Sequence, residues 1–397
     1  MKPRNTTLFV SLALSIAGLS PAWANHRTGS LILPELLQAG DFNEDGKLDL
    51  VVNSAGFDHV ALLFGDGTGN FILGGHFSTD TLPKGLQIGD VNHDGHLDVV
   101  TCMVWGYDVM VLFGDGKGAL HKVSPPSEID GDGEPSRLLL FDFNKDRNLD
   151  FVVTAPDDDK IQVYFGDGTG NFPAPPLEVK DITKPFGLAG GDVNGDGNID
   201  VVALSSAPPN SAINVLLDDG AGHFTVVKTP LAGSPSSVQL GDLNGDGKVD
   251  AVVAGAVPGN SSGNFFYTFL GDDTGQFTLN QTMQLGPGRL NGEVALGDFN
   301  EDGTLDLAFR NSGNTQEAPT VANLFIFFGD GDGNLTAGPA LTVGTEPHTV
   351  ITTDFNTDGH LDLAVSNRTD GTVSVLLGDG HGNFTLASVT SVLSPLN

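Results

Sequence analysis

The sequence predicts an all-β fold: a seven-bladed β-propeller with four antiparallel strands in each blade. Three features, each repeated along the chain, support this prediction: an Asp/Asn-rich loop, a Gly-Asp turn, and a proline that precedes the loop. They divide most of the 397 residues into units of about 50 residues, a period typical of propeller blades.

The first feature is a nine-residue loop with the pattern Asp-x-Asn-x-Asp-x-x-x-Asp, here called the Asp/Asn loop. Its seven copies, loops 1 to 7, are DFNEDGKLD (41–49), DVNHDGHLD (90–98), DFNKDRNLD (142–150), DVNGDGNID (192–200), DLNGDGKVD (242–250), DFNEDGTLD (298–306) and DFNTDGHLD (354–362). The regular spacing indicates one structural unit that is repeated seven times.

The other two features keep the same spacing. Gly-Asp turns follow the loops at 64–71, 113–120, 165–172, 217–224, 270–277, 328–335 and 377–384. A proline stands seven residues before six of the loops, at Pro34, Pro83, Pro135, Pro185, Pro235 and Pro347, whereas the sixth copy has Asn291 there. We therefore expect blades to begin near residues 31, 80, 132, 182, 232, 288 and 344.

The segments between these markers have the composition of strands. Each loop is followed by a short apolar run rich in β-branched residues, such as LDLVV or IDVVA, and no copy leaves room for a ten-residue amphipathic helix. A parallel β-helix has a shorter repeat, and independent domains of this size would be too small to hold a core. Since the first and last repeats both contain four strands, ring closure needs no exchanged strand, although residues 28–33 could add to the last blade.

The N-terminus predicts a signal peptide over residues 1–24. Lys2 and Arg4 precede an apolar run that is too short to span a bilayer, and Ala22-Trp23-Ala24 provides a small-x-small cleavage site. We therefore expect one propeller domain over residues 25–397, secreted to the extracellular space or periplasm, without membrane insertion.

The charge excludes some partners. The formal net charge is −32, and removal of Lys2 and Arg4 with the signal peptide leaves −34. Such a field repels nucleic acid, anionic membranes and polyuronate chains, and it attracts cations. Cys102 is the only cysteine, so an intrachain disulfide is excluded. We expect a monomer that binds no nucleic acid.

The Asp/Asn loops predict calcium sites. Positions 1, 3, 5 and 9 carry side-chain oxygens, position 7 offers its backbone carbonyl, and a set of hard oxygens with several carboxylates suits Ca²⁺. The predicted ligands are Asp41, Asn43, Asp45, Lys47 and Asp49; Asp90, Asn92, Asp94, His96 and Asp98; Asp142, Asn144, Asp146, Asn148 and Asp150; Asp192, Asn194, Asp196, Asn198 and Asp200; Asp242, Asn244, Asp246, Lys248 and Asp250; Asp298, Asn300, Asp302, Thr304 and Asp306; and Asp354, Asn356, Asp358, His360 and Asp362.

Two further points bear on these loops. Glycine at position 6, replaced by Arg147 in loop 3, permits the positive φ that turns the chain around an ion. Position 12 is not the glutamate of an EF-hand and lies in an exiting strand, so position 9 must close the site. The alternative is that the loops are Asp-Gly turns that hold no metal. Up to seven Ca²⁺ are predicted, and His93, His96 and His360 are expected to be solvated.

Taken together, the loops, strands and Gly-Asp turns resemble the FG-GAP/VCBS-type repeat family over about residues 31–390. The best-known members of this family are the propeller domains of integrin α subunits. The resemblance implies calcium on the loops that join strands 1 and 2, with ligand contacts on the opposite face from the 2–3 and 4–1 loops. Since these 397 residues contain no leg domains and no transmembrane segment of the integrin kind, we do not expect the integrin mode of adhesion.

Several residues are candidates for ligand contacts on that opposite face. Trp105 and Tyr107 lie in a predicted 2–3 loop, as do Arg310 and Arg368, and the 2–3 loops of copies five and six carry insertions (255–264 and 310–322). The residues that follow the repeat prolines should surround the channel mouth: Glu35, Lys84, Ser136, Phe186, Ser236 and His348.

These features favour a binding or adhesion scaffold for an extracellular protein or glycan over an enzyme. No Ser/His/Asp order or zinc-ligand spacing is present. The alternative is a polysaccharide lyase or hydrolase, which would need basic residues to hold an acidic substrate. The available cations on this face are Lys84, Arg137, Lys184, Arg289, Arg310 and Arg368. The strongly negative chain argues against that alternative.

Overall fold

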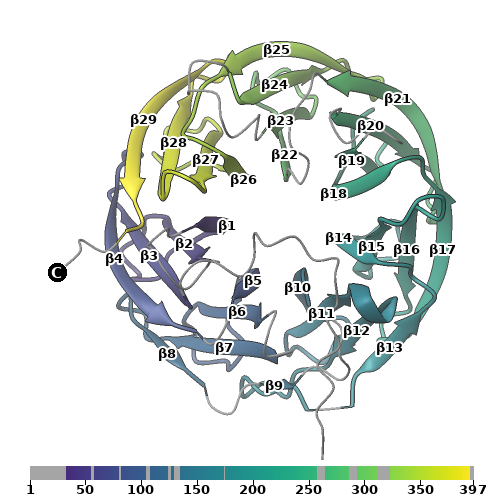
Figure 1. Cartoon of the computed structure of the whole chain (residues 1–397), viewed down its shortest axis with the longest axis horizontal. Coiled ribbons are helices and arrows are strands. Elements are labelled where there is room, and N and C mark those ends of the chain that lie inside the picture. The colour runs from purple at the N-terminus through teal and green to yellow at the C-terminus, as the bar shows by residue number, and fades with distance from the viewer. Residues whose placement is uncertain are drawn as a thin grey trace, which may run out of the picture. The chain divides into compact units, whose positions relative to one another are not determined.

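The computed structural model describes residues 33–54, 58–79, 82–103, 108–123, 127–128, 135–173, 175–256, 264–285, 293–311 and 322–393. Within this part, seven antiparallel sheets are arranged in a ring (Figure 1). The prediction of a seven-bladed propeller with four antiparallel strands per blade is confirmed. The predicted signal peptide, residues 1–24, lies outside the described residues.

Each blade runs from an innermost first strand to an outermost last strand, as Figure 1 shows. Blades 1 to 3 contain β1 (Pro34–Gly40), β2 (Asp49–Ser54), β3 (His59–Gly65) and β4 (Phe71–Ser78); β5 (Pro83–Gly89), β6 (Asp98–Met103), β7 (Asp108–Gly114), β8 (Leu120–Lys122) and β9 (Ser127–Glu128); and β10 (Leu138–Phe141), β11 (Asp150–Ala155), β12 (Lys160–Tyr164) and β13 (Leu177–Lys180). Blades 4 and 5 contain β14 (Pro185–Gly191), β15 (Asp200–Ser205), β16 (Ala212–Asp218) and β17 (Phe224–Pro230); and β18 (Ser234–Gly241), β19 (Asp250–Ala256), β20 (Asn264–Gly271) and β21 (Phe277–Leu285). Blades 6 and 7 contain β22 (Val294–Gly297), β23 (Asp306–Arg310), β24 (Leu324–Gly329) and β25 (Leu335–Leu341); and β26 (Pro347–Thr353), β27 (Asp362–Asn367), β28 (Thr372–Gly378) and β29 (Phe384–Ser391).

Two local features depart from the repeat. In blade 2 the outer strand is divided into β8 and β9, and both pieces pair with β7. Blade 3 has a single-turn 3-10 helix, η2 (Pro156–Asp158), between β11 and β12. Neither feature changes the four-layer order of the blade.

The repeated sequence markers coincide with the strand ends. Four innermost strands begin at a repeat proline, a position where the missing N–H of proline is tolerated. The second strand of every blade begins at the last aspartate of its Asp/Asn loop. These second strands are buried along almost their whole length, which explains why they read as continuous apolar runs.

The hydrophobic core lies between neighbouring blades. Seven clusters of buried side chains each join two adjacent sheets, for example Leu62 of blade 1 with Val99 of blade 2. The cluster that contains Val52 and Val375 joins blade 7 to blade 1 and so completes the ring. Burial of apolar surface between sheets stabilises every blade through its two neighbours.

Ring closure uses no exchanged strand in the described part of the chain, because each sheet contains strands of one repeat only. The outermost strands β29 and β4 lie side by side in Figure 1. Ser388 Oγ donates a hydrogen bond to the carbonyl of Gly69 at 2.8 Å, and Thr390 Oγ1 donates to the carbonyl of Phe71 at 3.0 Å. The suggestion that residues 28–33 add to the last blade falls almost entirely outside the described residues.

Candidate functional site

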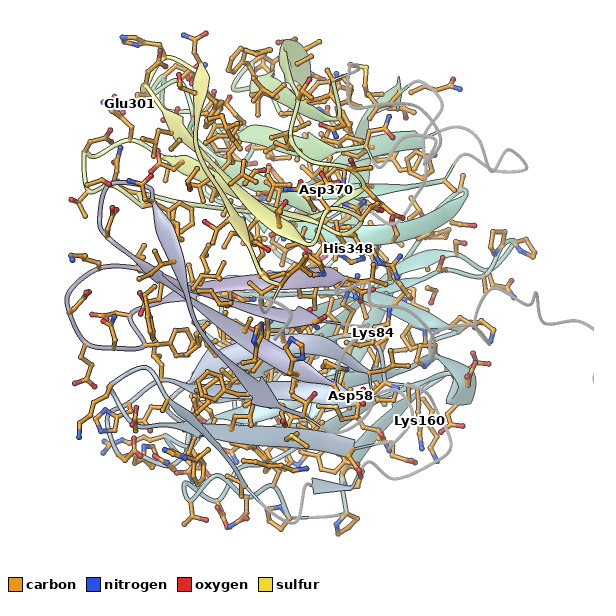
Figure 2. All side chains as sticks on the ribbon, turned by 60° about the vertical axis from the view of Figure 1, so that its left-hand side comes forward. Asp58, Lys84, Lys160, Glu301, His348 and Asp370 are labelled. Atoms are coloured by element: carbon orange, nitrogen blue, oxygen red, sulfur yellow. The ribbon has the colours of Figure 1, made fainter. Side chains whose placement is uncertain are left out.

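The seven Asp/Asn loops connect the first and second strands of the blades. Since all first strands start near the repeat prolines and end at the loops, the loops gather on one face of the ring. Figure 2 shows Glu301 of loop 6 at the edge of the molecule, away from Lys84 and His348 at the starts of innermost strands. The two faces therefore carry different sets of side chains.

Each loop is folded around its own backbone amides. In loop 1, Asp41 Oδ1 and Asn43 Oδ1 both accept the N–H of Asp45, at 3.1 and 3.0 Å, and Asp41 Oδ2 accepts the N–H of Gly46 at 2.8 Å. The same three bonds recur in loop 7, at 3.2, 3.0 and 2.9 Å. The side chains at positions 1 and 3 thus converge on the same amide.

The aspartate at position 5 is hydrogen-bonded to the same cluster of loop residues. In loop 2, the Asn92 Nδ2 amide donates to Asp94 Oδ2 at 3.0 Å, and Asp94 Oδ1 accepts the N–H of His96 at 2.9 Å. Equivalent Asn-to-Asp bonds are present in loops 3 to 7. Oxygens from positions 1, 3 and 5 are therefore held close together on the exposed side of the loop.

The aspartate at position 9 is different because it is fully buried. All seven residues at this position are 0% exposed: Asp49, Asp98, Asp150, Asp200, Asp250, Asp306 and Asp362. Asp49 Oδ2 accepts the N–H of Phe42 in its own loop, and Asp49 Oδ1 accepts the N–H of Gly65 at the start of the Gly-Asp turn, both at 3.0 Å. The carboxylate therefore joins two loops of one blade, a role that the sequence analysis missed.

Burial has an electrostatic consequence for these aspartates. Desolvation raises the pKa of Asp49, Asp98, Asp150, Asp200 and Asp306 to about 6, against the lowering effect of the two backbone hydrogen bonds. Burial also raises the pKa of Asp250 and Asp362. A buried carboxylate is stabilised in its charged form by a nearby cation.

The residues of the loops fit calcium in their chemistry. Each loop offers three aspartates, one asparagine oxygen and backbone carbonyls, which is an all-oxygen set of the kind Ca²⁺ takes. Within the described residues, no group of three or more His, Cys, Asp or Glu side chains has the spacing of a metal cage. The three aspartates of a loop, at positions 1, 5 and 9, therefore do not form such a cage by themselves, and a calcium site there would also use the amide at position 3 and the carbonyl at position 7.

The backbone at position 6 has the predicted positive φ in all seven loops. The glycines there have φ between 82° and 93°, and Arg147 in loop 3 has φ of 77°. Its N–H still donates to Asp142 Oδ2 at 2.8 Å, so loop 3 keeps the shape of the others. Position 4 also has positive φ, with a non-glycine residue in five loops: Glu44, His93, Lys145, Glu301 and Thr357. This second turn was not predicted, because the glycine that marks position 6 is absent from position 4 in these five loops.

Replacing Arg147 by glycine should tighten calcium binding at loop 3 by roughly tenfold. A non-glycine residue in the left-handed region costs about 1 kcal/mol, and about 1.4 kcal/mol corresponds to a factor of ten in affinity. The positive guanidinium near the ion adds a smaller, screened term. We expect the weakest step of a calcium titration to disappear in Arg147→Gly. A titration curve identical to that of the unmodified protein would show that loop 3 is not the weakest site.

Neighbouring loops touch one another through positions 4 and 7. His96 of loop 2 contacts Glu44 of loop 1, and His360 of loop 7 contacts Glu301 of loop 6. These hydrogen bonds to glutamate raise the pKa of both histidines. Both histidines are partly exposed to solvent, at 34% and 35%, as expected, and each has in addition a glutamate partner that was not predicted. The sequence signal for this contact is a glutamate at position 4 of one loop together with a histidine at position 7 of the next loop.

On the opposite face, several predicted contact residues lie outside the described part of the chain. Trp105 and Tyr107 belong to residues 104–107, Arg289 belongs to 286–292, and most of the two insertions belongs to 257–263 and 312–321. Their predicted roles remain predictions.

The described candidates on this face do not all lie together. Arg310 is 2% exposed and donates from Nη1 to the carbonyl of Pro347 at 2.6 Å. Arg368 forms an ion pair with Glu35 at 3.2 Å, whereas the exposed Lys184 lies against Asp157 at 3.5 Å. The structure therefore brings Arg310 and Arg368 to the channel mouth and keeps Lys184 apart from the ion pairs there.

Fold and loops together define a seven-bladed β-propeller built from repeats that each carry an Asp/Asn-rich loop. Residues 41–101, 142–203, 192–253 and 242–309 match the family described as FG-GAP-like repeat, and these segments cover more than half of the chain. The chain belongs to the FG-GAP-like repeat family. No curated protein matches it significantly.

Solved structures share the fold at low sequence identity. A protein from Lactobacillus plantarum is 14% identical, with a TM-score of 0.61 over 90% of this chain and 96% of that chain. Hydrazine synthase from Kuenenia stuttgartiensis is 14% identical, with a TM-score of 0.62 over 90% and 99%. BBS1N, solved in complex with ARL6DN, is 11% identical, with a TM-score of 0.57 over 88% and 94%. At such identities the likeness extends to the fold alone. Among the described residues, no helix has the length and apolar character needed to cross a bilayer.

Proposed function

We propose that this chain is an exported, calcium-loaded β-propeller that acts as a binding scaffold for an extracellular protein or glycan rather than as an enzyme. The seven buried position-9 aspartates are the observation that supports calcium binding. Each is 0% exposed and is held by backbone N–H groups beside two further loop aspartates. A calcium ion at each loop would compensate the repulsion among these carboxylates.

The binding role is supported by a difference in sequence variation between the two faces of the ring. The Asp/Asn loops are nearly identical in all blades, as a structural metal site requires, whereas the residues at the starts of the innermost strands differ from blade to blade. A rigid scaffold with variable residues at one end is the usual arrangement of a recognition surface. Trp105 and Tyr107 are proposed to add aromatic contacts to that surface.

Metal analysis combined with thermal unfolding tests the calcium part of the proposal. At millimolar free calcium, we expect most loops to be filled and the melting temperature to fall markedly after chelation, because calcium binds only the folded loop. High salt should restore only part of the loss, since it screens repulsion without replacing the ligand. Fewer than half of the loops filled at that calcium concentration would contradict the site assignment.

The scaffold part is tested on a glycan array in calcium, with the retained glycans then examined for cleavage. Retention without cleavage supports a scaffold. Release of shortened or unsaturated sugar products would instead favour the polysaccharide-degrading enzyme.

A further inference from the structure

Blade 4 departs from the other blades at the residue that begins the Gly-Asp turn. Six blades have a glycine at this place: Gly65, Gly114, Gly166, Gly271, Gly329 and Gly378. Blade 4 instead has Asp218, the last residue of β16, which is only 3% exposed. A carboxylate is therefore buried where the other repeats have no side chain.

The side chain at this place leaves the backbone toward the Asp/Asn loop. In the six other blades, a Cβ added to the glycine would collide with the carbonyl oxygen at position 8 of the loop. In blade 4, the backbone N–H of Asp218 donates to Asp200 Oδ1 at 2.8 Å, and Asn198 Nδ2 donates to the carbonyl of Asp218 at 3.1 Å. Asp218 is thus hydrogen-bonded to positions 9 and 7 of loop 4, both of which are predicted ligand positions.

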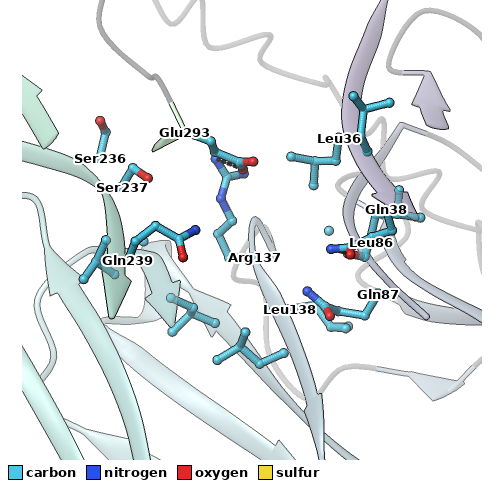
Figure 3. Close-up of a pocket in the computed structure, with 16 residues that line it drawn as sticks. Leu36, Gln38, Leu86, Gln87, Arg137, Leu138, Ser236, Ser237, Gln239 and Glu293 are labelled. Atoms are coloured by element: carbon cyan, nitrogen blue, oxygen red, sulfur yellow. Dashed lines mark hydrogen bonds and ion pairs between the residues drawn. The ribbon is translucent and has the colours of Figure 1, made fainter. Parts of the chain in front are cut away.

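The other buried carboxylates in the described ranges have partners. Glu35, which is 2% exposed, forms ion pairs with two basic residues. Each of the seven position-9 aspartates accepts two backbone N–H groups. Even the partly exposed Glu293 lies 3.5 Å from Arg137, as the dashed line in Figure 3 marks. By contrast, the buried Oδ1 of Asp218 has no hydrogen-bond partner among the residues that the structure describes.

The electrostatic surroundings of Asp218 favour a cation. Burial raises the pKa of Asp218 more than the backbone N–H groups of its turn lower it, and the carboxylates of Asp219 and Asp196 raise it further. Lys145 of loop 3 reaches loop 4, but its Nζ donates to the carbonyl of Gly197 at 3.2 Å. A buried carboxylate without a partner is costly, and a bound cation would remove that cost.

The Asp/Asn loop by itself leaves room for a further calcium ligand. Ca²⁺ takes about six to eight oxygen ligands, whereas the loop supplies ligands from five positions. Where the turn begins with glycine, water is left to complete the coordination. In blade 4, the carboxylate of Asp218 stands beside positions 7 and 9 instead. The number of charged ligands sets the affinity of a calcium loop, so this difference should separate loop 4 from the other six.

We propose that Asp218 is a further ligand of the calcium ion of loop 4, bound to the ion or to one of its waters. As a fourth carboxylate beside the three of the loop, it makes loop 4 the last of the seven sites to lose its ion. This inference rests on the calcium loading proposed above. It deepens that proposal by naming a ligand outside the repeat pattern.

Equilibrium dialysis against calcium buffers, with bound calcium counted per chain, tests the inference. In the unmodified protein, one ion should remain at a free calcium concentration at which the others have left. Asp218→Asn should raise the free calcium needed to hold this ion on the order of tenfold. Asp218→Gly should do the same, and because it restores the residue of the six other blades, it should keep the fold.

Two matched controls assign the effect to ligation at loop 4. Asp219→Asn removes the same charge from the next residue, which is exposed, and should leave the tightest ion in place. Asp196→Ala, at position 5 of loop 4, should remove that ion, whereas Asp246→Ala, at position 5 of loop 5, should not. Loop 5 is the closest comparison, because its first six residues differ from those of loop 4 only at position 2.

The outcomes separate this inference from the proposed function. No calcium on the unmodified protein would contradict the calcium loading itself. Calcium on most loops, with the same binding curve for Asp218→Asn, Asp218→Gly and the unmodified protein, would overturn only the role of Asp218. Equal weakening by Asp219→Asn would also overturn it, because the effect would then come from nearby charge and not from a ligand.

Discussion

Acidification from pH 7 to pH 5 is expected to stabilise the calcium-free propeller and to destabilise the calcium-loaded one. Five position-9 aspartates have a pKa raised by burial to about 6, from 3.8 in an unfolded chain. A group whose folded-state pKa is raised contributes stability at low pH and loses it as the pH rises through the folded pKa. Without metal, the window of this effect is therefore about pH 4 to 6.

The expected magnitude is large because the effect recurs in every blade. A shift of about two pKa units corresponds to roughly 3 kcal/mol for one aspartate, although contributions from coupled loops do not simply add. Burial lowers the pKa of His59 to about 4 and that of His348 well below 6.5, which gives the opposite slope as the pH falls below 6.5, but these are two groups against seven position-9 aspartates. The aspartates should therefore dominate the calcium-free protein.

With calcium bound, the same protons compete with the metal. Protonation of a ligand carboxylate releases the ion, so the stability gained from binding falls as the pH falls. Urea unfolding at pH 5, 6 and 7, with chelator and with saturating calcium, measures both slopes. Slopes of the same sign under the two conditions would show that the position-9 aspartates do not take part in binding calcium.

The local repeat units were predictable from the sequence because their determinants are local. Strand ends, the Asp/Asn loops and the positive φ at position 6 all depend on residues within one copy, including the unusual Arg147. The pairing of neighbouring loops and of position 9 with the Gly-Asp turn depends on contacts across blades or across strands. Those contacts are set by the packing of the ring, which no single repeat specifies.

The glycine that begins each Gly-Asp turn shows how such a contact leaves a sequence signal. A Cβ on Gly65 would lie 2.1 Å from the carbonyl oxygen of Leu48, and the equivalent glycines in five other blades face the same collision. Blade 4 has Asp218 at this place, and its backbone N–H still bonds to Asp200 at 2.8 Å. The close approach of the two loops, which the hydrogen bonds of position 9 require, therefore explains why glycine recurs at this place in six of the seven repeats.

The channel mouth could not be predicted from total charge. The net value of −32 averages over carboxylates that are concentrated in the Asp/Asn loops, at the other end of the innermost strands. Lys84, Arg137, Arg310 and Arg368 are far apart in sequence, yet in the folded ring all four help burial to lower the pKa of His348. Local electrostatics depends on tertiary structure, whereas composition gives only the long-range field.

Replacing a position-9 aspartate by alanine is expected to destabilise the protein even when no calcium is present. Asp98 accepts the N–H groups of Val91 and Gly114, at 3.0 and 2.9 Å, and Asp98→Ala leaves both amides buried without an acceptor. An unpaired buried donor costs about 1–3 kcal/mol, so the free energy of unfolding should fall by about 2–5 kcal/mol. The comparison is made at pH 5 with chelator, where the carboxyl of Asp98 is mostly protonated and its charge contributes little.

The matched control is Asp94→Ala in the same loop. Asp94 is an exposed position-5 aspartate, so this variant should lower the calcium-free stability by less than about 1 kcal/mol. In saturating calcium at pH 7, both variants should lose the ion of loop 2, because each lacks a proposed ligand carboxylate. The difference in calcium-free stability between the two variants therefore measures the structural role of position 9 separately from its role as a ligand. If urea unfolding gave equal losses for the two variants in chelator, the carboxylate of Asp98 would not be the link between the Asp/Asn loop and the Gly-Asp turn.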